Sequence, residues 1–255
     1  MISVSIVTYS TPRAELERCL QCLQASKLVS SVRVVDNEKG RNIGYGAGHN
    51  IGISESSEEY HLVINSDVHF EPGTLEYLHD YMQTHPDVGQ CMPKVFYPDG
   101  TLQYACRLLP TPFDLFLRRF LPQTWFARRR EKYTLANSGH NKEMNVPYHM
   151  GCFMLFRRSV LEEIAVDNKG RKEYFDERYF LYPEDIDITR RIHRKYKTMF
   201  VPNVSIVHAH KAASYHSARM ALIHIYNMCK YFNKWGWFFD KERAQFNYDC
   251  LKQIN

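Results

Sequence analysis

Long apolar stretches are missing from this sequence of 255 residues. No window reaches the roughly 20 consecutive apolar residues that a membrane-spanning helix needs. The basic and apolar segments of a secretory signal are missing too, because Met1-Ile2-Ser3-Val4 opens directly into a strand pattern. We therefore expect a cytoplasmic protein, and peripheral attachment to the inner face of the cytoplasmic membrane stays open.

A disulfide framework is also missing. The seven cysteines are scattered and odd in number, and most lie in apolar runs such as residues 151–155. Cys19 and Cys22 form a CxxC motif inside a helical pattern with no second pair nearby, which disfavours zinc and redox chemistry. We expect reduced, buried thiols.

The third feature that the sequence lacks is a strong excess of charge of one sign. The net charge of +5 fits an anionic ligand or an anionic membrane surface, but it does not indicate nucleic acid. Of the residues, 44% are hydrophobic and 24% charged, which is ordinary globular composition, and repeats, low-complexity segments and an obvious linker are absent. The length allows one large α/β domain or two small ones.

Alternating strand and helix patterns predict the fold class. Apolar runs at 3–8, 32–35, 61–64 and 88–95 indicate strands, and helical patterns cover 11–26 and 72–85. This alternation implies crossover connections and a mostly parallel sheet flanked by helices. Ligands bind beyond the carboxyl ends of such strands, where Asp36 and Asp67 fall.

The second half is less regular. We expect strands at 151–156 and 198–207, helices from 160 and from 188, and a long helical tail at 217–239. Residues 108–130 form a basic, aromatic stretch with prolines that is helical in part.

A glycine-rich segment, residues 42–52, follows the second strand. The dinucleotide-binding fingerprint would instead follow the first strand and open a helix. That position holds Tyr9-Ser10-Thr11-Pro12, without glycine, so a Rossmann dehydrogenase is disfavoured.

Three further groups are candidates for metal binding or catalysis. Asp67, after the third strand, suits a magnesium ion that faces a diphosphate, but capping of the turn before Pro72 explains it equally well. The acidic run at 184–187 precedes a helical pattern, where acids also stabilise the helix dipole. His208 and His210 follow a late strand, where they suit metal ligands or hydrogen-bonded core residues.

The order of these features resembles the family-2 inverting glycosyltransferases of the GT-A fold, in particular their bacterial rhamnosyltransferase-like branch. The resemblance covers residues 3–230. Its matching stretches are SIVTY at 5–9, VVDN at 34–37, NIGYGAGHN at 42–50, NSDV at 65–68, GCFML at 151–155, FDERYF at 175–180 and YPEDID at 182–187. Together these motifs are specific to the family, although not to one sugar.

The resemblance implies a GT-A (Rossmann-like) fold and a role for each matching residue. Asp185 matches the catalytic base, and Asp67 and His208 match ligands of a divalent cation, Mg²⁺ or Mn²⁺. At the first position of the family's DxD motif this sequence has Asn65, whose amide oxygen can still face a hydrated metal. The residues implied to bind the nucleotide or donor are Thr8, Tyr9, Asp36, Asn42, Gly44, Asn50, Asn65 and Ser66, and those implied to contact the acceptor or support the site are Glu184 and Arg107.

The implied reaction is a single displacement that inverts the anomeric carbon. Asp185 takes the proton of the acceptor hydroxyl, and the metal at Asp67 assists the departing nucleoside diphosphate. The implied donor is a nucleotide-diphosphate sugar, with dTDP-rhamnose as the candidate, and the acceptor is a glycan or a polyprenyl-linked glycan of a cell-surface polysaccharide such as O-antigen or capsule. The alternatives are a sugar-nucleotide nucleotidyltransferase, which would need a glycine-rich basic loop after the first strand, and a non-catalytic nucleotide- or glycan-binding module.

We expect residues 1–215 to form the transferase domain, with a nucleotide-binding half at 1–100 and an acceptor-binding half at 101–215. Residues 216–255 would form a helical, aromatic and basic segment. Cations and aromatics interleave at 118–130 and 230–239, a combination that suits a membrane headgroup region. Packing of these aromatics onto the domain is the equal alternative.

Overall fold

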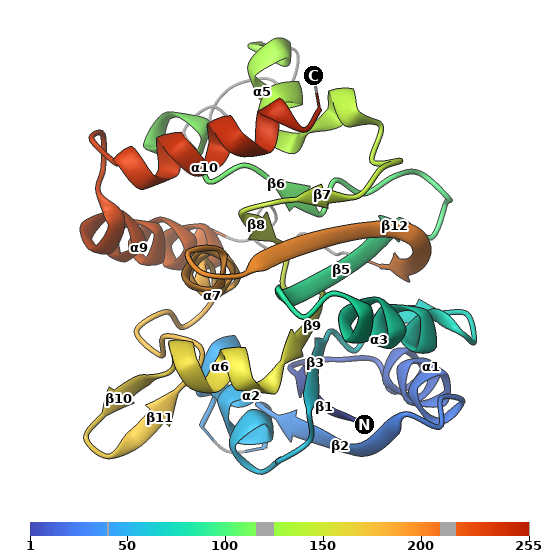
Figure 1. Cartoon of the computed structure of the whole chain (residues 1–255). Helices are drawn as coiled ribbons and strands as arrows, with labels where there is room; N and C mark the ends of the chain where they lie inside the picture. Colours follow the sequence, from blue (N-terminus) through green and yellow to red (C-terminus); the bar gives the residue numbers. More distant parts are fainter. Residues whose placement is uncertain (40, 116–124, 210–217, 255) are drawn as a thin grey trace.

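The computed structural model describes residues 1–39, 41–115, 125–209 and 218–254 (Figure 1). His210 and part of the aromatic and basic stretch at 118–130, including Arg118, Arg119 and Phe120, lie outside these ranges.

A mixed sheet forms the centre of the described chain. Its eight strands follow the order β2-β1-β3-β9-β5-β12-β4, and β7 also pairs with β12. The strands are β1 Ile2–Thr8, β2 Val29–Asp36, β3 Tyr60–Ile64, β4 Val68–Phe70, β5 Val88–Phe96, β7 Met144–Asn145, β9 Phe153–Arg157 and β12 Lys197–His208. Among these, β2, β1, β3, β5 and β12 share one direction, which confirms the mostly parallel sheet. The strand predicted at 151–156 is β9, and it runs antiparallel between β3 and β5.

Helices cover both faces of the sheet (Figure 1). One face contacts α1 Arg13–Gln24 and α3 Thr74–Thr84, and the other contacts α2 Tyr45–Ser54, α6 Arg158–Ile164 and α7 Glu184–His193. Neighbouring residues of β3 show the two-sided burial: Leu62 packs in the cluster that includes α1 and α3, while Val63 packs with α2, α6 and α7. Such burial on both faces explains why the central strands are continuous apolar runs.

Two small sheets and four further helices lie in the described ranges. The sheets pair β6 Cys106–Arg107 with β8 Tyr148–His149, and β10 Val166–Asn168 with β11 Arg171–Glu173. The remaining helices are α5 Ala127–Thr134, the 3₁₀ turn η1 Ala136–Ser138, α9 Ala218–Trp235 and α10 Lys241–Lys252. All seven cysteines lie in the described ranges as free thiols, five of them buried, as expected.

The glycine-rich segment at 42–52 was not assigned to a helix from the sequence. Most of it is the helix α2, and its glycines let the helix lie against β1. A Cβ atom on Gly48 would meet Val7 Cγ2 at 2.6 Å, and one on Gly52 would meet Ser5 Cβ at 2.6 Å. Close packing of helix and strand therefore outweighs the low helix propensity of glycine here.

The predicted tail helix at 217–239 is also corrected. The helix α9 ends at Trp235, Gly236 follows with φ +103°, and a second helix, α10, begins at Lys241. Likewise, α7 begins at Glu184 and not at 188, so the acidic run forms its first turn.

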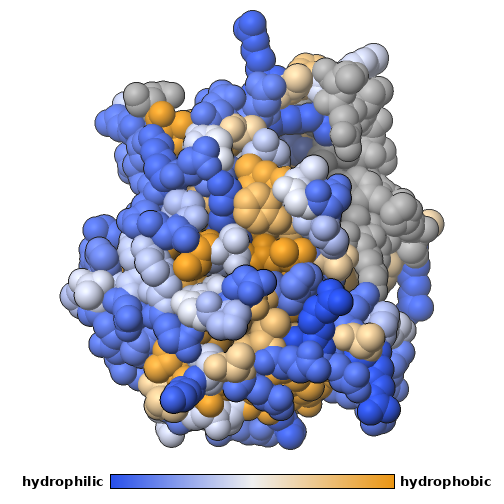
Figure 2. Space-filling view, turned by 90° about the vertical axis from the view of Figure 1, so that its right-hand side faces the viewer, coloured by the Kyte–Doolittle hydropathy of each residue, from blue (hydrophilic) through white to orange (hydrophobic). Residues whose placement is uncertain are grey.

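One face of the molecule, seen in Figure 2, is mainly hydrophilic, with hydrophobic residues gathered near its centre. Among the described residues, no helix is both long and apolar enough to cross a membrane.

Candidate active site

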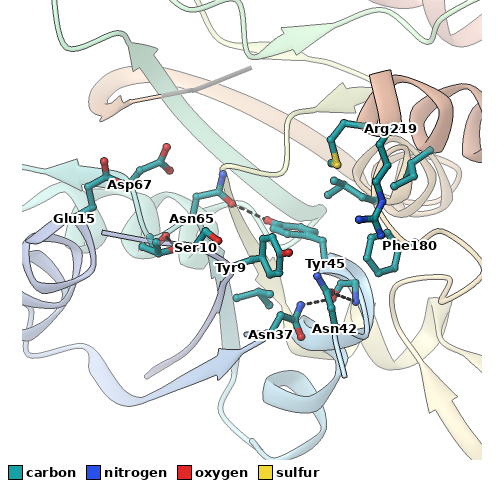
Figure 3. A pocket seen from close by; sticks show the side chains of 17 residues that line it. Tyr9, Ser10, Glu15, Asn37, Asn42, Tyr45, Asn65, Asp67, Phe180 and Arg219 are labelled. Carbon is teal, nitrogen blue, oxygen red and sulfur yellow. Dashed lines mark hydrogen bonds between the residues drawn. The ribbon is translucent and has the colours of Figure 1, made fainter. Parts of the chain in front are cut away.

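A cleft of about 480 Å³ opens where β1 and β3 end, at the edge where the sequence predicted a ligand site. Its walls come from segments far apart in the chain: the turn after β1, the loop before α2, the residues after β3, the loop before α7 and the described start of α9 (Figure 3). The lining residues are Val7, Tyr9, Ser10, Thr11, Glu15, Asn37, Asn42, Gly44, Tyr45, Asn65, Ser66, Asp67, Phe180, Leu181, Arg219, Met220 and Ile223.

Tyr45, the first residue of α2, ties the cleft to the strand β9. Its hydroxyl lies 3.1 Å from Oδ1 of Asn65 (Figure 3). The carbonyl oxygen of Gly151, just before β9, lies 2.5 Å from the same hydroxyl. The hydroxyl has one proton and two neighbouring acceptors, so it can donate to either of them. Tyr45 therefore connects Asn65 and Gly151 in one hydrogen-bonded group.

The loop before α2 shapes a second wall. The backbone N–H of Gly44 donates to Oδ1 of Asn42 at 2.9 Å, and its carbonyl accepts from Nδ2 of Asn37 at 3.2 Å. Gly44 has φ +93°, and a Cβ atom there would lie 2.4 Å from the carbonyl oxygen of Phe180. A side chain at this position is therefore excluded by both backbone conformation and space.

Asp67 and His208 converge at one end of the cleft. Their facing atoms, His208 Nε2 and Asp67 Oδ1, are 3.4 Å apart, and Asn65 Nδ2 lies 3.3 Å from the same ring nitrogen. The other ring nitrogen, Nδ1, lies 2.7 Å from Oε1 of Gln103. Because the amide oxygen only accepts, we assign the proton to Nδ1, so the Nε2 lone pair accepts from Nδ2 of Asn65 and lies beside the Asp67 carboxylate.

Burial lowers the pKa of His208 to about 4, so its imidazole is neutral near pH 7. A neutral imidazole lone pair and a carboxylate that face each other are suitable ligands for a divalent cation. Among the described residues, no three His, Cys, Asp or Glu side chains converge to form a ligand shell. The pair fits a metal whose other ligands are diphosphate oxygens and water, which is a usual arrangement for Mg²⁺.

Asp185 lies in the first turn of α7, half-buried, with its carboxylate held by two backbone donors. The N–H of Gly151 donates to Oδ2 at 3.0 Å, and the N–H of Ile186 donates to Oδ1 at 2.8 Å. Burial raises the pKa of Asp185 above its usual value, although both donors oppose the shift. Gly151 thus links the Asp185 carboxylate to the Tyr45 hydroxyl across one residue.

Glu184 is almost fully buried beside Asp185. Burial, and then the charge of Asp185, raises its pKa well above the usual value. Its Oε2 atom has no hydrogen-bond partner in the described part of the chain, which favours a neutral carboxyl group.

The structure brings most of the sequence-predicted donor residues together. Tyr9, Asn42, Gly44, Asn65, Ser66 and Asp67 line the cleft, and Thr8 is buried at the end of β1 beside it. Asp185, Glu184 and His208 are not among the lining residues, and three further predicted residues also lie outside the lining. Asp36 accepts a hydrogen bond from the N–H of Glu38 and has Lys39 Nζ 3.6 Å away. Asn50 pairs with both backbone polar groups of Phe175, at 2.8 and 2.9 Å.

Arg107, the third, lies on β6, where its Nε donates to the carbonyl of Tyr104 at 2.9 Å. Its positive charge is one of the influences that lower the pKa of Asp185, after the two backbone donors.

Sequence reasoning missed one wall of the cleft. Arg219, Met220 and Ile223 of α9 line it, and Arg219 points toward Phe180 (Figure 3). The available signal was the helical spacing of residues 219, 220 and 223. That spacing does not indicate which face of the helix contacts residues more than 150 positions earlier in the sequence.

A mostly parallel α/β sheet with helices on both faces, and a polar cleft at its carboxyl edge, is the arrangement of the GT-A fold. The profile of glycosyl transferase family 2 matches residues 13–165, which is more than half of the chain. The chain therefore belongs to glycosyl transferase family 2, and the expected family and fold are confirmed.

A curated relative narrows the comparison. The chain is 28% identical over 250 residues to an N-acetylglucosaminyl-diphospho-decaprenol L-rhamnosyltransferase of Mycobacterium tuberculosis, across 84% of this chain and 77% of the relative.

Solved structures agree on the fold. GalNAc-T7, crystallised with UDP, GalNAc and Mn²⁺, superposes with a TM-score of 0.57 at 14% identity, across 81% of this chain and 42% of that one. TarS of S. aureus superposes with a TM-score of 0.57 at 13% identity, across 99% of this chain and 43% of that one. This chain thus spans less than half the length of either structure.

Proposed function

We propose that this enzyme transfers a sugar from a nucleotide-diphosphate sugar to a hydroxyl group of an acceptor glycan, with inversion at the anomeric carbon. The observation that carries the proposal is the pairing of two groups around one cleft. The facing Asp67 and His208 suit a cation at one end, and the Asp185 carboxylate is held by backbone donors near Tyr45 and Gly151.

The reaction we propose is one displacement. The acceptor oxygen attacks the anomeric carbon, its proton passes to Asp185, and the bond to the diphosphate oxygen breaks as the nucleoside diphosphate leaves. The raised pKa of Asp185 supports this role, because a more basic carboxylate accepts a proton more readily. If Glu184 beside it is neutral, the Asp185 carboxylate is the one group of the pair that gains or loses a proton during the reaction.

Asp67 and His208 would hold the divalent cation, Mg²⁺ or Mn²⁺, with Asn65 beside them. When bound there, the cation would stabilise the charge that develops on the departing diphosphate. Two fold relatives support this choice, because the structures of GalNAc-T7 and of a mannosyltransferase from Pyrobaculum calidifontis both contain Mn²⁺. Arg219 adds a positive charge on the opposite wall.

The rhamnosyltransferase relative supports dTDP-rhamnose as the first donor to test and a polyprenyl-linked glycan as the acceptor. An acceptor of that kind belongs to a cell-surface polysaccharide, and it would hold the enzyme against the membrane from which the lipid emerges. We therefore propose peripheral association with an anionic membrane surface.

The experiment measures nucleoside diphosphate release from a panel of donors, with and without metal, for the wild type and for Asp185→Asn. The substitution keeps size and hydrogen bonding but removes the proton acceptor, so we expect turnover to fall by roughly 10²–10⁴-fold while donor binding survives. If Asp185→Asn loses donor affinity but keeps turnover at saturation, Asp185 binds and does not catalyse. If the wild type releases no nucleoside diphosphate from any donor, a non-catalytic binding module would be favoured.

A further inference from the structure

The helix α9 and the turn that follows it expose an unusual amount of apolar surface. Phe239 is 98% exposed and Phe238 is 77% exposed, in the turn between α9 and α10 that stands at the left edge of the molecule in Figure 1. On α9 itself, Leu222 and Tyr226 are 67% and 66% exposed and Ile225 is 43% exposed. Burying a phenylalanine side chain is worth about 1.5–3 kcal/mol, so surface of this kind indicates a partner.

The exposed residues lie on one stripe. Positions 222, 225, 226, 229 and 233 recur at helical spacing on one side of α9, and Asn233 accepts a 2.8 Å hydrogen bond from the indole of Trp237 in the turn. The stripe therefore covers about 17 Å of helix and continues into the Phe238–Phe239 turn. We call these residues, Leu222, Ile225, Tyr226, Phe238 and Phe239, the α9 patch.

The opposite side of α9 is fully used by the fold. Met228, Tyr231 and Phe232 are buried against Leu109, Tyr148, Tyr179 and Ile186. Both alternatives for residues 230–239 therefore apply to part of the segment: Tyr231 and Phe232 pack onto the domain, whereas Trp237, Phe238 and Phe239 are more than a third exposed. The α9 patch is what remains outside after the core has formed.

The charges around the patch identify its partner. From Ala218 to Lys241 the sequence carries a single acid, Asp240, and four cations, of which Arg219 lines the cleft and Lys234 pairs with buried acids, so Lys230 and Lys241 remain for the patch. Asp240 is buried and paired with Arg190 at 2.7 Å, so it does not repel an anionic surface. Lys230 lies with its ammonium 4.4 Å from the centre of the Tyr226 ring, within the patch, and Lys241 is exposed beside the turn. Exposed phenylalanines among lysines suit the headgroup region of an anionic bilayer.

The position of the patch relative to the cleft is the decisive point. Arg219, Met220 and Ile223 line the cleft from one face of α9, and Leu222, Ile225 and Tyr226 lie on the neighbouring face of the same helix. A surface that binds the patch therefore lies next to the opening of the cleft.

We propose that the α9 patch docks the enzyme on an anionic lipid bilayer and so directs the cleft toward a glycan that emerges from that bilayer on a lipid carrier. The proposal rests on the proposed function for the identity of the acceptor. The docking step is independent of it, because it requires only the α9 patch and a lipid surface.

The test is flotation with vesicles of phosphatidylcholine and phosphatidylglycerol at low salt, and with phosphatidylcholine alone. We expect the wild type to float with the anionic vesicles, and the double variant Phe238→Ser/Phe239→Ser to lose binding by about tenfold or more. Tyr77→Ser is the matched control, because Tyr77 is an exposed aromatic on α3, on the other side of the molecule in Figure 1, and should float like the wild type.

Nucleoside diphosphate release from the donor alone, without vesicles, is measured on the same proteins. Because both phenylalanines are exposed, the double variant should keep that release and the melting temperature of the wild type. A wild type that stays in the soluble fraction with both vesicles overturns the docking proposal, and so does a double variant that floats undiminished. A patch that instead joins two copies, seen as a dimer that the double variant loses without flotation, overturns it as well. If the wild type releases no nucleoside diphosphate from any donor, the proposed function is contradicted. The docking proposal is then decided by the flotation result alone.

Discussion

His208 Nε2 lies 3.4 Å from Oδ1 of Asp67, while Nδ1 of the same ring lies 2.7 Å from Oε1 of Gln103. The Gln103 contact orients the ring and places its proton on Nδ1, so the Nε2 lone pair faces both the Asp67 carboxylate and the Asn65 amide, whose Nδ2 lies 3.3 Å away. We therefore expect substitutions of Asp67, His208 and Gln103 to weaken metal binding to different degrees. A residue that only orients a ligand, such as Gln103, contributes less to metal affinity than the ligand itself.

We expect Asp67→Ala to abolish metal-dependent turnover and to weaken nucleoside diphosphate binding in Mn²⁺. His208→Ala should have a smaller effect, and Gln103→Ala should lower metal affinity by about 10- to 100-fold, as for other partners that orient a ligand. Calorimetric titration of the diphosphate with and without Mn²⁺ measures all three. Asp80→Ala, an exposed acid on α3, is the control. Full activity in excess chelator would show that a cationic side chain such as Arg219 does this work.

The pH dependence should identify the base. Burial raises the pKa of Asp185, and only the ionised form accepts a proton, so kcat/KM should fall about tenfold per pH unit below that pKa. The acidic limb should therefore lie above the pH range of an ordinary aspartate, near 4. Glu184, whose pKa is raised further by burial, stays protonated across this limb, so Glu184→Gln should leave its position unchanged. A limb that disappears in Glu184→Gln and persists in Asp185→Asn would make Glu184 the base.

The strands and their polar ends could be predicted because buried strands in an α/β sheet are short apolar runs that stop abruptly. Asp67 after Ile64 is the clearest case. The helix α2 could not be predicted from propensity, because three glycines in its ten residues indicate a loop. What decides the helix is a tertiary contact, the approach of Gly48 to Val7, which a single sequence does not contain. The α9 wall of the cleft was missed for the same reason.

That contact gives a stability prediction. Gly48→Ala would place a Cβ atom 2.6 Å from Val7 Cγ2, so we expect a loss of about 1–3 kcal/mol from overpacking. Activity should fall as well, because Tyr45 begins the same helix. Val7→Ala removes the clashing methyl groups, so the double variant should be more stable than the sum of the two single effects. Urea unfolding of the four proteins gives the coupling energy. Simple additivity would contradict the assigned contact.

The fourth prediction concerns the attachment of α9 to α7, the helix that carries Asp185. Asp187 is completely buried, and its carboxylate receives Lys234 Nζ at 2.7 Å, Trp235 Nε1 at 2.8 Å and Arg191 Nε at 2.9 Å. Lys234 also lies 2.9 Å from Oδ2 of Asp176. Lys234 and Trp235 belong to α9, so the helix that lines the cleft is fixed to the helix that carries the base.

We expect Lys234→Met to cost about 1–3 kcal/mol of stability, less than the 3–5 kcal/mol of a fully broken buried pair, because Arg191 and Trp235 still hold Asp187. Because the α9 wall shifts relative to Asp185, kcat should fall more than donor affinity. Lys195→Met is the matched control: its partner Glu163 lies 2.6 Å away in an exposed pair, which contributes less than about 1 kcal/mol. Chemical denaturation of both variants measures the loss of stability, and steady-state kinetics measures kcat and donor affinity. Equal small effects would mean that α9 is held by its apolar face alone, and a stability loss without a change in kcat would restrict Lys234 to folding.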